Sequence, residues 1–416
     1  MDAVTRRKFL LASGVAGAGA LMAGTTALGI AELLRKGEKA YAGQHGHTLV
    51  LVTLYGGNDG LNTLIPYADP VYFRTRPDLA YAPERVLHLD GELGLNPKLP
   101  GFKRLWDEKH LAIVRGVGYP RPDRSHFRSM DIWQTGAPLT PVHTGWIGRW
   151  LDGTRATPET AVSFEPVLPV LLAGETRAGA CVSIGGLALP EGINVEMVAG
   201  LGHRQAGEPP FQAHAATSYT DLLEVEHLVR EVEHAKGAGE KGAEPDVPAT
   251  GTGGASVLST QLAMVARCVE AGVPTRVYSV SLGGFDTHAK EIIGHEMLLG
   301  QLDTALTSFV DRMGASEAGR QVTVLVYSEF GRRVHGNASE GTDHGTAAPV
   351  FALGHRVAGG FYGEQPSLTD LDDGDLKATM DFRQVFGTLL GSVLQADPAK
   401  YIDGFEGDPM PFIHAS

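Results

Sequence analysis

The chain has 416 residues, of which 43% are hydrophobic and 20% are charged. This composition excludes a disordered chain and predicts a globular protein with a large buried core, in one large domain or two closely joined ones. The formal net charge is -13. An acidic surface has no general electrostatic attraction to nucleic acid or to an anionic membrane, so neither is an expected partner.

The N-terminus has the pattern of an export signal. Arg6 and Arg7 stand before Lys8-Phe9-Leu10, and an uncharged run rich in Ala, Gly and Leu extends from 11 to 31. A twin arginine before a weakly hydrophobic run favours the twin-arginine route, which carries folded proteins, over the ordinary secretory route. We therefore predict a signal peptide over residues 1–42 that is recognised by the twin-arginine translocon. The protein would then act in the periplasm or outside the cell.

The sequence Ala40-Tyr41-Ala42 offers a cleavage site before Gly43. An uncleaved anchor is the alternative, because the apolar run approaches the roughly 20 residues that span a bilayer. No later stretch is long and apolar enough to span, so no stable membrane span is expected after processing. The segment to Ala42 has six basic and three acidic residues, and the chain without it would carry a net charge of -16.

Five apolar runs bounded by glycine or turn residues have the pattern of strands covered on both faces. They are residues 48–55, 111–117, 275–282, 322–327 and 349–353. Apolar residues at helical spacing predict helices over 258–269 and 292–313. The resulting order of helix, strand, helix and strand implies a parallel sheet with right-handed crossovers. We therefore predict an α/β fold with a mainly parallel central sheet.

The middle of the chain differs in composition. Residues 158–210 alternate short apolar runs with Gly and Pro, and residues 235–256 are crowded with Gly, Ala, Pro, Glu and Lys. The second stretch has little to bury and is typical of a flexible surface loop. We expect residues 158–256 to form an insertion or cap beside the main sheet. Cys181 and Cys268 lie far apart, which leaves open a disulfide between them or a buried free thiol at Cys268.

Acids and imidazoles flank the predicted strands. They are Asp59 after the first strand, Asp286 and His288 after the strand to Leu282, Glu329 after the strand to Tyr327, and Asp343 and His344 before the strand from Pro349. The carboxyl ends of parallel strands meet at one edge of a sheet, where ligand sites form in open α/β folds. Side chains from these distant segments are therefore expected to converge.

Carboxylate oxygen and neutral imidazole nitrogen are ligands of zinc and manganese. We predict that Asp286, His288 and His344 form a three-ligand site for one of these ions. The other three acids are predicted to hold a second ion nearby or to orient the histidines. For Asp59 and Asp343 the alternative is a role in turns near glycine, where Asx-turns are common.

Six stretches carry a resemblance to a known family. They are LYGGNDGLNTLIPY, DRSHFRSMDIWQTG, GGFDTH, YSEFGRRVHGN, GTDHGTAAPVFALG and MDFRQVFGTLL. In this order they resemble the domain of unknown function 1501 family of twin-arginine-exported bacterial proteins. That family is grouped by similarity with the alkaline phosphatase and sulfatase superfamily. The resemblance implies an alkaline-phosphatase-like three-layer sandwich over residues 43–416.

The resemblance also implies roles for single residues. The superfamily's metal ligands are similar to Asp59, Asp286, His288 and His344. Its Asp-His pair after a central strand is absent, because Glu329-Phe330 stands there, so one metal site would lose an imidazole. A rival alignment places that pair at Asp343-His344-Gly345, which no long strand directly precedes.

The superfamily's nucleophile sits at a helix N-terminus, and Ser125 is similar to it. Arg124 or Arg128 would then hold the oxygens of an anionic substrate, with help from the helix N-terminus. The alternative is that Ser125 only caps the helix, since serine is a preferred N-cap. His126 and His143 are expected to be surface or packing residues.

The expected activity follows from these residues. Neither Ser125 nor the cysteines have the spacing of a formylglycine sulfatase, which favours phosphate or related esters over sulfate esters. We expect an exported metal-dependent hydrolase with one or two ions and a small anionic ester as substrate. The alternative is a non-catalytic exported metal-binding protein that keeps the fold as a binding or assembly partner.

Overall fold

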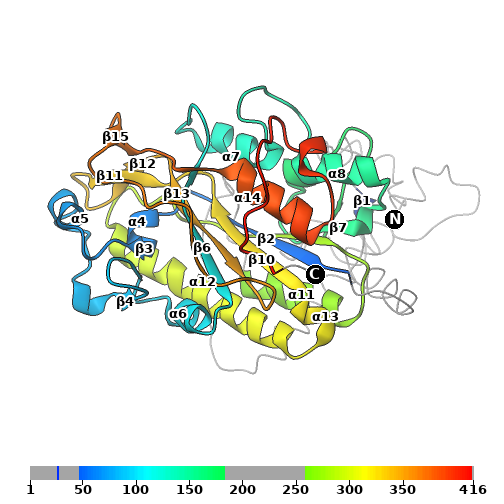
Figure 1. The fold of residues 1–416 in the computed structure, drawn as a ribbon, viewed down its shortest axis with the longest axis horizontal. Coiled ribbons are helices and arrows are strands. Elements are labelled where there is room, and N and C mark those ends of the chain that lie inside the picture. The colour runs from blue at the N-terminus through cyan, green and yellow to red at the C-terminus, as the bar shows by residue number, and fades with distance from the viewer. Residues whose placement is uncertain (1–25, 28–45, 183–257, 415–416) are drawn as a thin grey trace, which may run out of the picture.

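The computed structural model describes residues 26–27, 46–182 and 258–414. In this part of the chain a ten-stranded sheet lies between two groups of helices (Figure 1). The predicted signal peptide lies outside the described residues except for Thr26–Ala27, which pair with the edge of the sheet. Among the described helices, none is long and apolar enough to cross a membrane.

The described strands of the central sheet follow one order. It is β1 (Thr26–Ala27), β8 (Ala180–Cys181), β7 (Ala161–Ser163), β9 (Val277–Leu282), β2 (Thr48–Leu54), β10 (Val322–Ser328), β13 (Ala348–Leu353), β6 (Leu111–Gly118) and β14 (Gly360–Tyr362), with β17 (Met380–Asp381) also paired to β6. Among these strands only β13 is antiparallel to its neighbours. The five predicted strands are confirmed to within two residues at either end, and so is the α/β fold with a mainly parallel sheet.

Strand β2 shows why these segments form the centre. All seven of its residues are buried between β9 and β10, as its continuous apolar run predicts. Val50 and Val52 face one hydrophobic core, while Leu49 and Leu51 face another on the opposite side of the sheet. Both faces of the sheet are therefore covered.

Helices from separate parts of the sequence cover the two faces of the sheet. On one side lie α6 (Pro100–Asp107), α11 (Leu258–Glu270), α12 (Glu291–Gly314) and the short α13 (Glu317–Arg320), and on the other α7 (His126–Thr135), α8 (Trp146–Thr154) and α14 (Phe382–Thr388) (Figure 1). The two helices predicted from apolar spacing, α11 and α12, are confirmed. A π-helical turn over Leu389–Val393 continues α14.

Shorter elements complete the described chain. They are α4 (Gly60–Thr63), β3 (Leu64–Ile65), α5 (Pro70–Thr75), β4 (Leu87–His88), β5 (Gly94–Leu95), β11 (Arg332–Gly336), β12 (Thr342–His344), β15 (Leu371–Asp372), β16 (Asp375–Leu376) and the 3-10 turns Pro83–Arg85, Pro158–Thr160, Val170–Leu172 and Pro398–Lys400. Strands β11 and β12 pair with each other, as do β15 and β16. These small hairpins lie at the edge of the sheet where the site forms.

The predicted insertion is only partly described. Its first part contains β7 and β8, which pair within the central sheet rather than beside it. The remainder, residues 183–256 with the predicted loop 235–256, lies outside the described residues. Cys181 and Cys268 are both free, which excludes the disulfide alternative, and Cys268 is buried as the other alternative expects.

A buried histidine predicts how stability depends on pH. Helix α12 places His295 in the interior, with Nε2 2.9 Å from Asn58 Oδ1. Burial lowers the pKa of His295 to about 4, despite the opposing charge of Asp59. The unfolded chain takes up a proton near its ordinary pKa of about 6.5, so the folded state loses stability between pH 6.5 and 4, by about 3 kcal/mol.

His295→Gln should flatten this pH dependence, because glutamine can donate to Asn58 but does not titrate. The measurement is urea unfolding at pH 7 and pH 4. His335→Gln, at an exposed position on β11, is the control and should keep the wild-type slope. An unchanged slope in His295→Gln would assign the acid sensitivity to other groups.

Candidate metal centre

The carboxyl edge of the sheet gathers loops from distant parts of the chain. The segments after β2, β9 and β10 meet there, as expected for parallel strands. Strand β13 runs antiparallel, so the residues before it, rather than after it, reach this edge. This orientation brings β12 with His344 beside the loop that follows β9.

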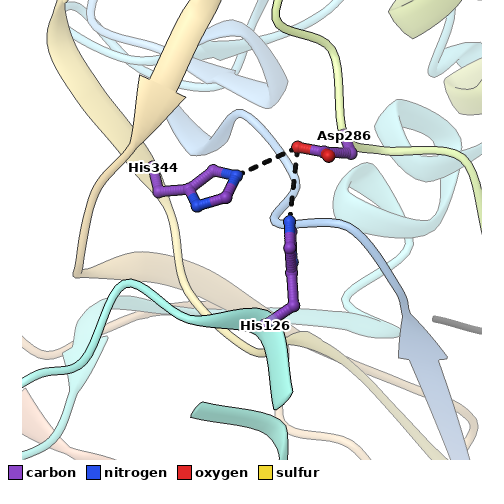
Figure 2. Close-up of side chains that lie close together, drawn as sticks. All are labelled: His126, Asp286 and His344. Atoms are coloured by element: carbon purple, nitrogen blue, oxygen red, sulfur yellow. Dashed lines mark hydrogen bonds and ion pairs between the residues drawn. The ribbon is translucent and has the colours of Figure 1, made fainter. Parts of the chain in front are cut away.

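Three side chains form one cluster at this edge (Figure 2). His126 begins α7, Asp286 follows β9, and His344 ends β12. One ligand atom from each lies within 4.8 Å of the others. His126 Nε2 is 3.4 Å and His344 Nε2 is 3.1 Å from the same oxygen, Asp286 Oδ1. Two imidazoles therefore converge on one carboxylate.

His288 adds a further nitrogen to the cluster. Its Nε2 is 3.0 Å from Asp286 Oδ1 and 2.9 Å from His344 Nε2. Behind it, Asp343 Oδ1 lies 3.6 Å from His288 Nδ1 and accepts a hydrogen bond from Asn337 Nδ2 at 3.1 Å. The structure thus brings the three predicted ligands Asp286, His288 and His344 together, with Asp343 beside them.

Hydrogen bonds on the far side of each ring fix the tautomers. His126 Nδ1 lies 2.8 Å from Glu329 Oε1, and His344 Nδ1 lies 2.8 Å from the carbonyl oxygen of Arg124. Both partners only accept, so each Nδ1 carries a proton, and Nε2 is the nitrogen of each ring that is left for a ligand. His126 Nε2 is buried and has no hydrogen-bond partner among the described residues. The Nε2 atoms of both rings therefore face the oxygen of Asp286.

The electrostatics of the cluster favour a positive charge between these groups. Burial lowers the pKa of His126, but the neighbouring carboxylates of Asp286 and Glu329 outweigh it and raise the pKa to about 9. Burial raises the pKa of Asp286. His126, His344 and Arg332 outweigh this effect and hold the pKa of this carboxyl well below its usual range. With its pKa raised to about 9, His126 carries a proton on both nitrogens near neutral pH, and a metal ion at Nε2 would take the place of one of them.

Glu329 holds His126 in place and is itself fully engaged. Its side chain is 1% exposed, and Oε1 also accepts a hydrogen bond from Gly56 N at 2.9 Å. Oε2 accepts from Ser328 Oγ at 3.0 Å. Of the two roles predicted for Glu329, these contacts fit the orientation of a histidine, the arrangement common behind metal-binding imidazoles.

Asp59 lies apart from the cluster, in a buried ion pair. Its Oδ2 is 2.5 Å from Arg76 Nη1, both side chains are 0% exposed, and Oδ1 caps α4 by accepting from Leu61 N at 3.2 Å. Burial favours the neutral acid, but Arg76 outweighs it and lowers the pKa of Asp59 to about 2. Burial and the charge of Asp59 raise the pKa of neighbouring Glu291 to about 9. These contacts fit a structural role for Asp59.

Ser125 occupies the N-cap position of α7 with its side chain exposed. Within the described part of the chain its hydroxyl makes no capping hydrogen bond, while its backbone N–H donates to Asp123 Oδ1 at 2.7 Å. The arginines beside it are engaged elsewhere. Arg124 pairs with Asp373 and Asp375, and Arg128 pairs with Asp131.

Residues 118–415 match the family described as "Protein of unknown function (DUF1501)". The chain belongs to this DUF1501 family. Solved structures similar to it include a protein in the alkaline phosphatase superfamily from Vibrio parahaemolyticus, with 10% identity, a TM-score of 0.35, and coverage of 93% of this chain and 77% of that one. The phosphonate monoester hydrolase of Agrobacterium radiobacter has 12% identity, a TM-score of 0.34, and coverage of 87% and 78%. Among curated proteins no sequence matches.

One residue of the cluster in this DUF1501 protein is not among the ligands that the sequence predicts. His126 was expected to be a surface or packing residue, but its side chain is only 15% exposed and faces Asp286. The expectation of a surface position does hold for His143, which is exposed. The available signal was the position of His126 directly after Ser125, at a helix start near the site.

A substitution at Asp59 separates its structural role from the predicted role as a metal ligand. Asp59→Asn leaves the buried Arg76 without its charged partner, which should cost about 3 kcal/mol of unfolding free energy. The metal content of the folded protein should not change. Asp311→Asn, at the exposed partner of Arg104, is the matched control and should cost less than about 1 kcal/mol. Denaturant unfolding and elemental analysis measure both quantities, and loss of metal from folded Asp59→Asn would restore Asp59 as a ligand.

Proposed function

We propose that this protein is a metal-dependent hydrolase of phosphate or related esters, and that His126, Asp286 and His344 bind its divalent ion, zinc or manganese. One observation carries the proposal. The Nε2 atoms of His126 and His344 face a single carboxylate oxygen, while the other nitrogen of each ring is held by an acceptor. Imidazole and carboxylate are the ligands these ions take.

The spacing of the donor atoms supports the same assignment. Nε2 of His126 and His344 lie 3.4 and 3.1 Å from Asp286 Oδ1, and Nε2 of His288 lies 3.0 Å from it. Tetrahedral zinc with bonds of 2.0–2.1 Å keeps its ligand atoms roughly 3.3 Å apart. The separations between Asp286 Oδ1 and the three nitrogens are therefore close to those around one small divalent ion, and His288 offers a fourth position.

The residues around this centre suit the chemistry of an ester. A bound divalent ion would act as a Lewis acid toward an ester oxygen. Asp286 and His288 leave the centre accessible, since their side chains are 47% and 45% exposed. The N-terminus of α7 favours an anionic group, and we propose the exposed hydroxyl of Ser125 as the nucleophile.

An exported metal-binding protein without catalysis is the second candidate. Arg124 and Arg128, which would hold an anionic substrate, are both engaged by carboxylates, and Asp59 is paired with Arg76. An anionic substrate would have to compete with Asp131, Asp373 and Asp375 for these arginines. Turnover separates the two candidates.

Loss of a metal ligand should lower metal affinity more than loss of a residue that only supports a ligand. His126→Ala and His344→Ala each delete a donor, so metal affinity should fall by more than about 100-fold, whereas Glu329→Ala only frees the His126 ring and should cost 10 to 100-fold. His355→Ala, at the opposite end of β13 against His110, is the control and should bind metal like the wild type. Elemental analysis and melting with and without chelator measure this. Equal metal content in all four variants, or none in the wild type, would refute the centre.

A panel of phosphate, phosphonate and sulfate esters tests catalysis on the metal-loaded protein. If Ser125 attacks, Ser125→Gly should abolish turnover while metal content and melting temperature stay within the wild-type range. Near-normal turnover in this variant would exclude Ser125 as the nucleophile and would not affect the proposal of a metal centre. No turnover in the wild type with metal bound would favour the non-catalytic candidate.

We further propose export by the twin-arginine translocon, which rests on the sequence alone. Changing Arg6 and Arg7 together to Lys should leave folded precursor in the cytoplasm, because the adjacent arginines are the recognised element. Cell fractionation with detection of the mature chain is the measurement. Changing Arg35 and Lys36, which lie behind the apolar run, is the control and should not affect export. Mature protein outside the cytoplasm in the first variant would exclude this route.

A further inference from the structure

A cavity of about 690 Å³ lies beside the metal centre, where β6 and β17 end. Two of its residues also contact the cluster. The Phe330 ring centroid is 4.9 Å from those of His126 and His344, and the Arg124 carbonyl accepts from His344 Nδ1. None of the proposed ligands lines this space. It is therefore a second compartment next to the centre, of a volume usual for small-molecule sites.

The lining of this cavity offers acceptors of hydrogen bonds. Its carboxylates are those of Asp123, Asp372, Asp373, Asp375 and Asp381. Its two cationic side chains are already engaged, Arg124 with Asp373 and Asp375, and Lys377 with Asp370 outside the cavity. Asp381 is in turn held by Arg383, and Arg124 is shared between Asp373 and Asp375. The cavity therefore offers a ligand carboxylate acceptors and no unpaired cation among the residues that line it.

Asp375 lies buried in the wall of the cavity. Its side chain is 2% exposed, and both of its oxygens face guanidinium groups, Oδ2 that of Arg124 and Oδ1 that of Arg333 at 3.3 Å. Burial raises the pKa of this carboxyl, against the effect of Arg124. At the rim, Asp373 is 82% exposed and Asp372 is exposed as well. The exposed carboxylates of Asp372 and Asp373 are therefore the acceptors of this group that the donors of a ligand can reach.

We infer that this cavity holds the alcohol half of the substrate ester, and that this half carries several hydrogen-bond donors, hydroxyl or ammonium groups. The inference rests on the proposed hydrolase function. An ester whose anionic end lies at Asp286 and His344 would extend past Phe330 into the cavity. A purely aliphatic alcohol would desolvate the carboxylates without replacing their hydrogen bonds, and an anionic one would be repelled.

The test uses three phosphate monoesters of similar size on the metal-loaded protein: glucose 6-phosphate, glucosamine 6-phosphate and cyclohexylmethyl phosphate. Binding is measured by ligand-observed NMR, and hydrolysis by phosphate release. Ala378→Trp fills the cavity from an exposed lining position, and Ala399→Trp, at an exposed alanine outside it, is the matched control. Asp372→Asn removes one rim charge with little change of shape.

The wild type and Ala399→Trp should prefer the two sugar phosphates to the cyclohexyl ester by at least ten-fold in affinity. Ala378→Trp should lose that preference while its metal content stays unchanged. Asp372→Asn should weaken glucosamine 6-phosphate more than glucose 6-phosphate if the donor is an ammonium group, and both alike if hydroxyl groups dominate.

Equal affinities in the two tryptophan variants, or a preference for the cyclohexyl ester, would overturn the inference. Selective binding without phosphate release would keep the cavity assignment and refute hydrolysis of phosphate esters. Hydrolysis of all three esters alike, unaffected by Ala378→Trp, would keep the proposed function and refute the cavity assignment.

Discussion

The site depends on one buried guanidinium. Arg332 is 1% exposed, and its nitrogens donate to the carbonyl oxygens of Gly57 at 2.6 Å, of Thr342 at 3.1 Å and of Phe285 at 2.9 Å, and to Asp286 Oδ1 at 2.8 Å. A buried charge is tolerated only when its donors are satisfied, so these three loops must stay together. Arg332 thereby fixes the carboxylate on which the imidazoles converge.

The histidines are held by a different set of contacts from the carboxylate. His126 depends on Glu329 at the end of β10, and His344 depends on the backbone of the loop before α7. Each ring is fixed through Nδ1, so its Nε2 direction is set by groups that never face the cluster. Such preorganisation is what a metal site requires, because rings that already point inward lose little freedom when an ion binds.

Much of the fold could be predicted because its strands are buried on both faces and read as continuous apolar runs, as β2 does. The convergence of Asp286 and His344 followed from strand ends, although the reason His344 reaches that edge, the antiparallel course of β13, has no signal in local sequence. The place of His126 in the cluster was not predicted, because a histidine at a helix start has the same local sequence whether it packs against the fold or faces a site. The ion pair of Asp59 with Arg76 could not be predicted either, since Arg76 reaches Asp59 only through the position of α5 in the folded protein.

The exposure of the cluster bears on whether the centre is catalytic or structural. Structural zinc sites are closed by four protein ligands, whereas catalytic ones keep an open position. Here the rings of His126 and His344 are 15% and 23% exposed, while Asp286 and His288 on the β9 loop are nearly half exposed. The protein therefore encloses the proposed metal centre on the side of α7 and β12 and leaves it open on the side of the β9 loop. If His288 binds the ion, four protein groups close the centre and a structural ion is favoured; if His288 stays free, the open position that hydrolysis needs is at its place.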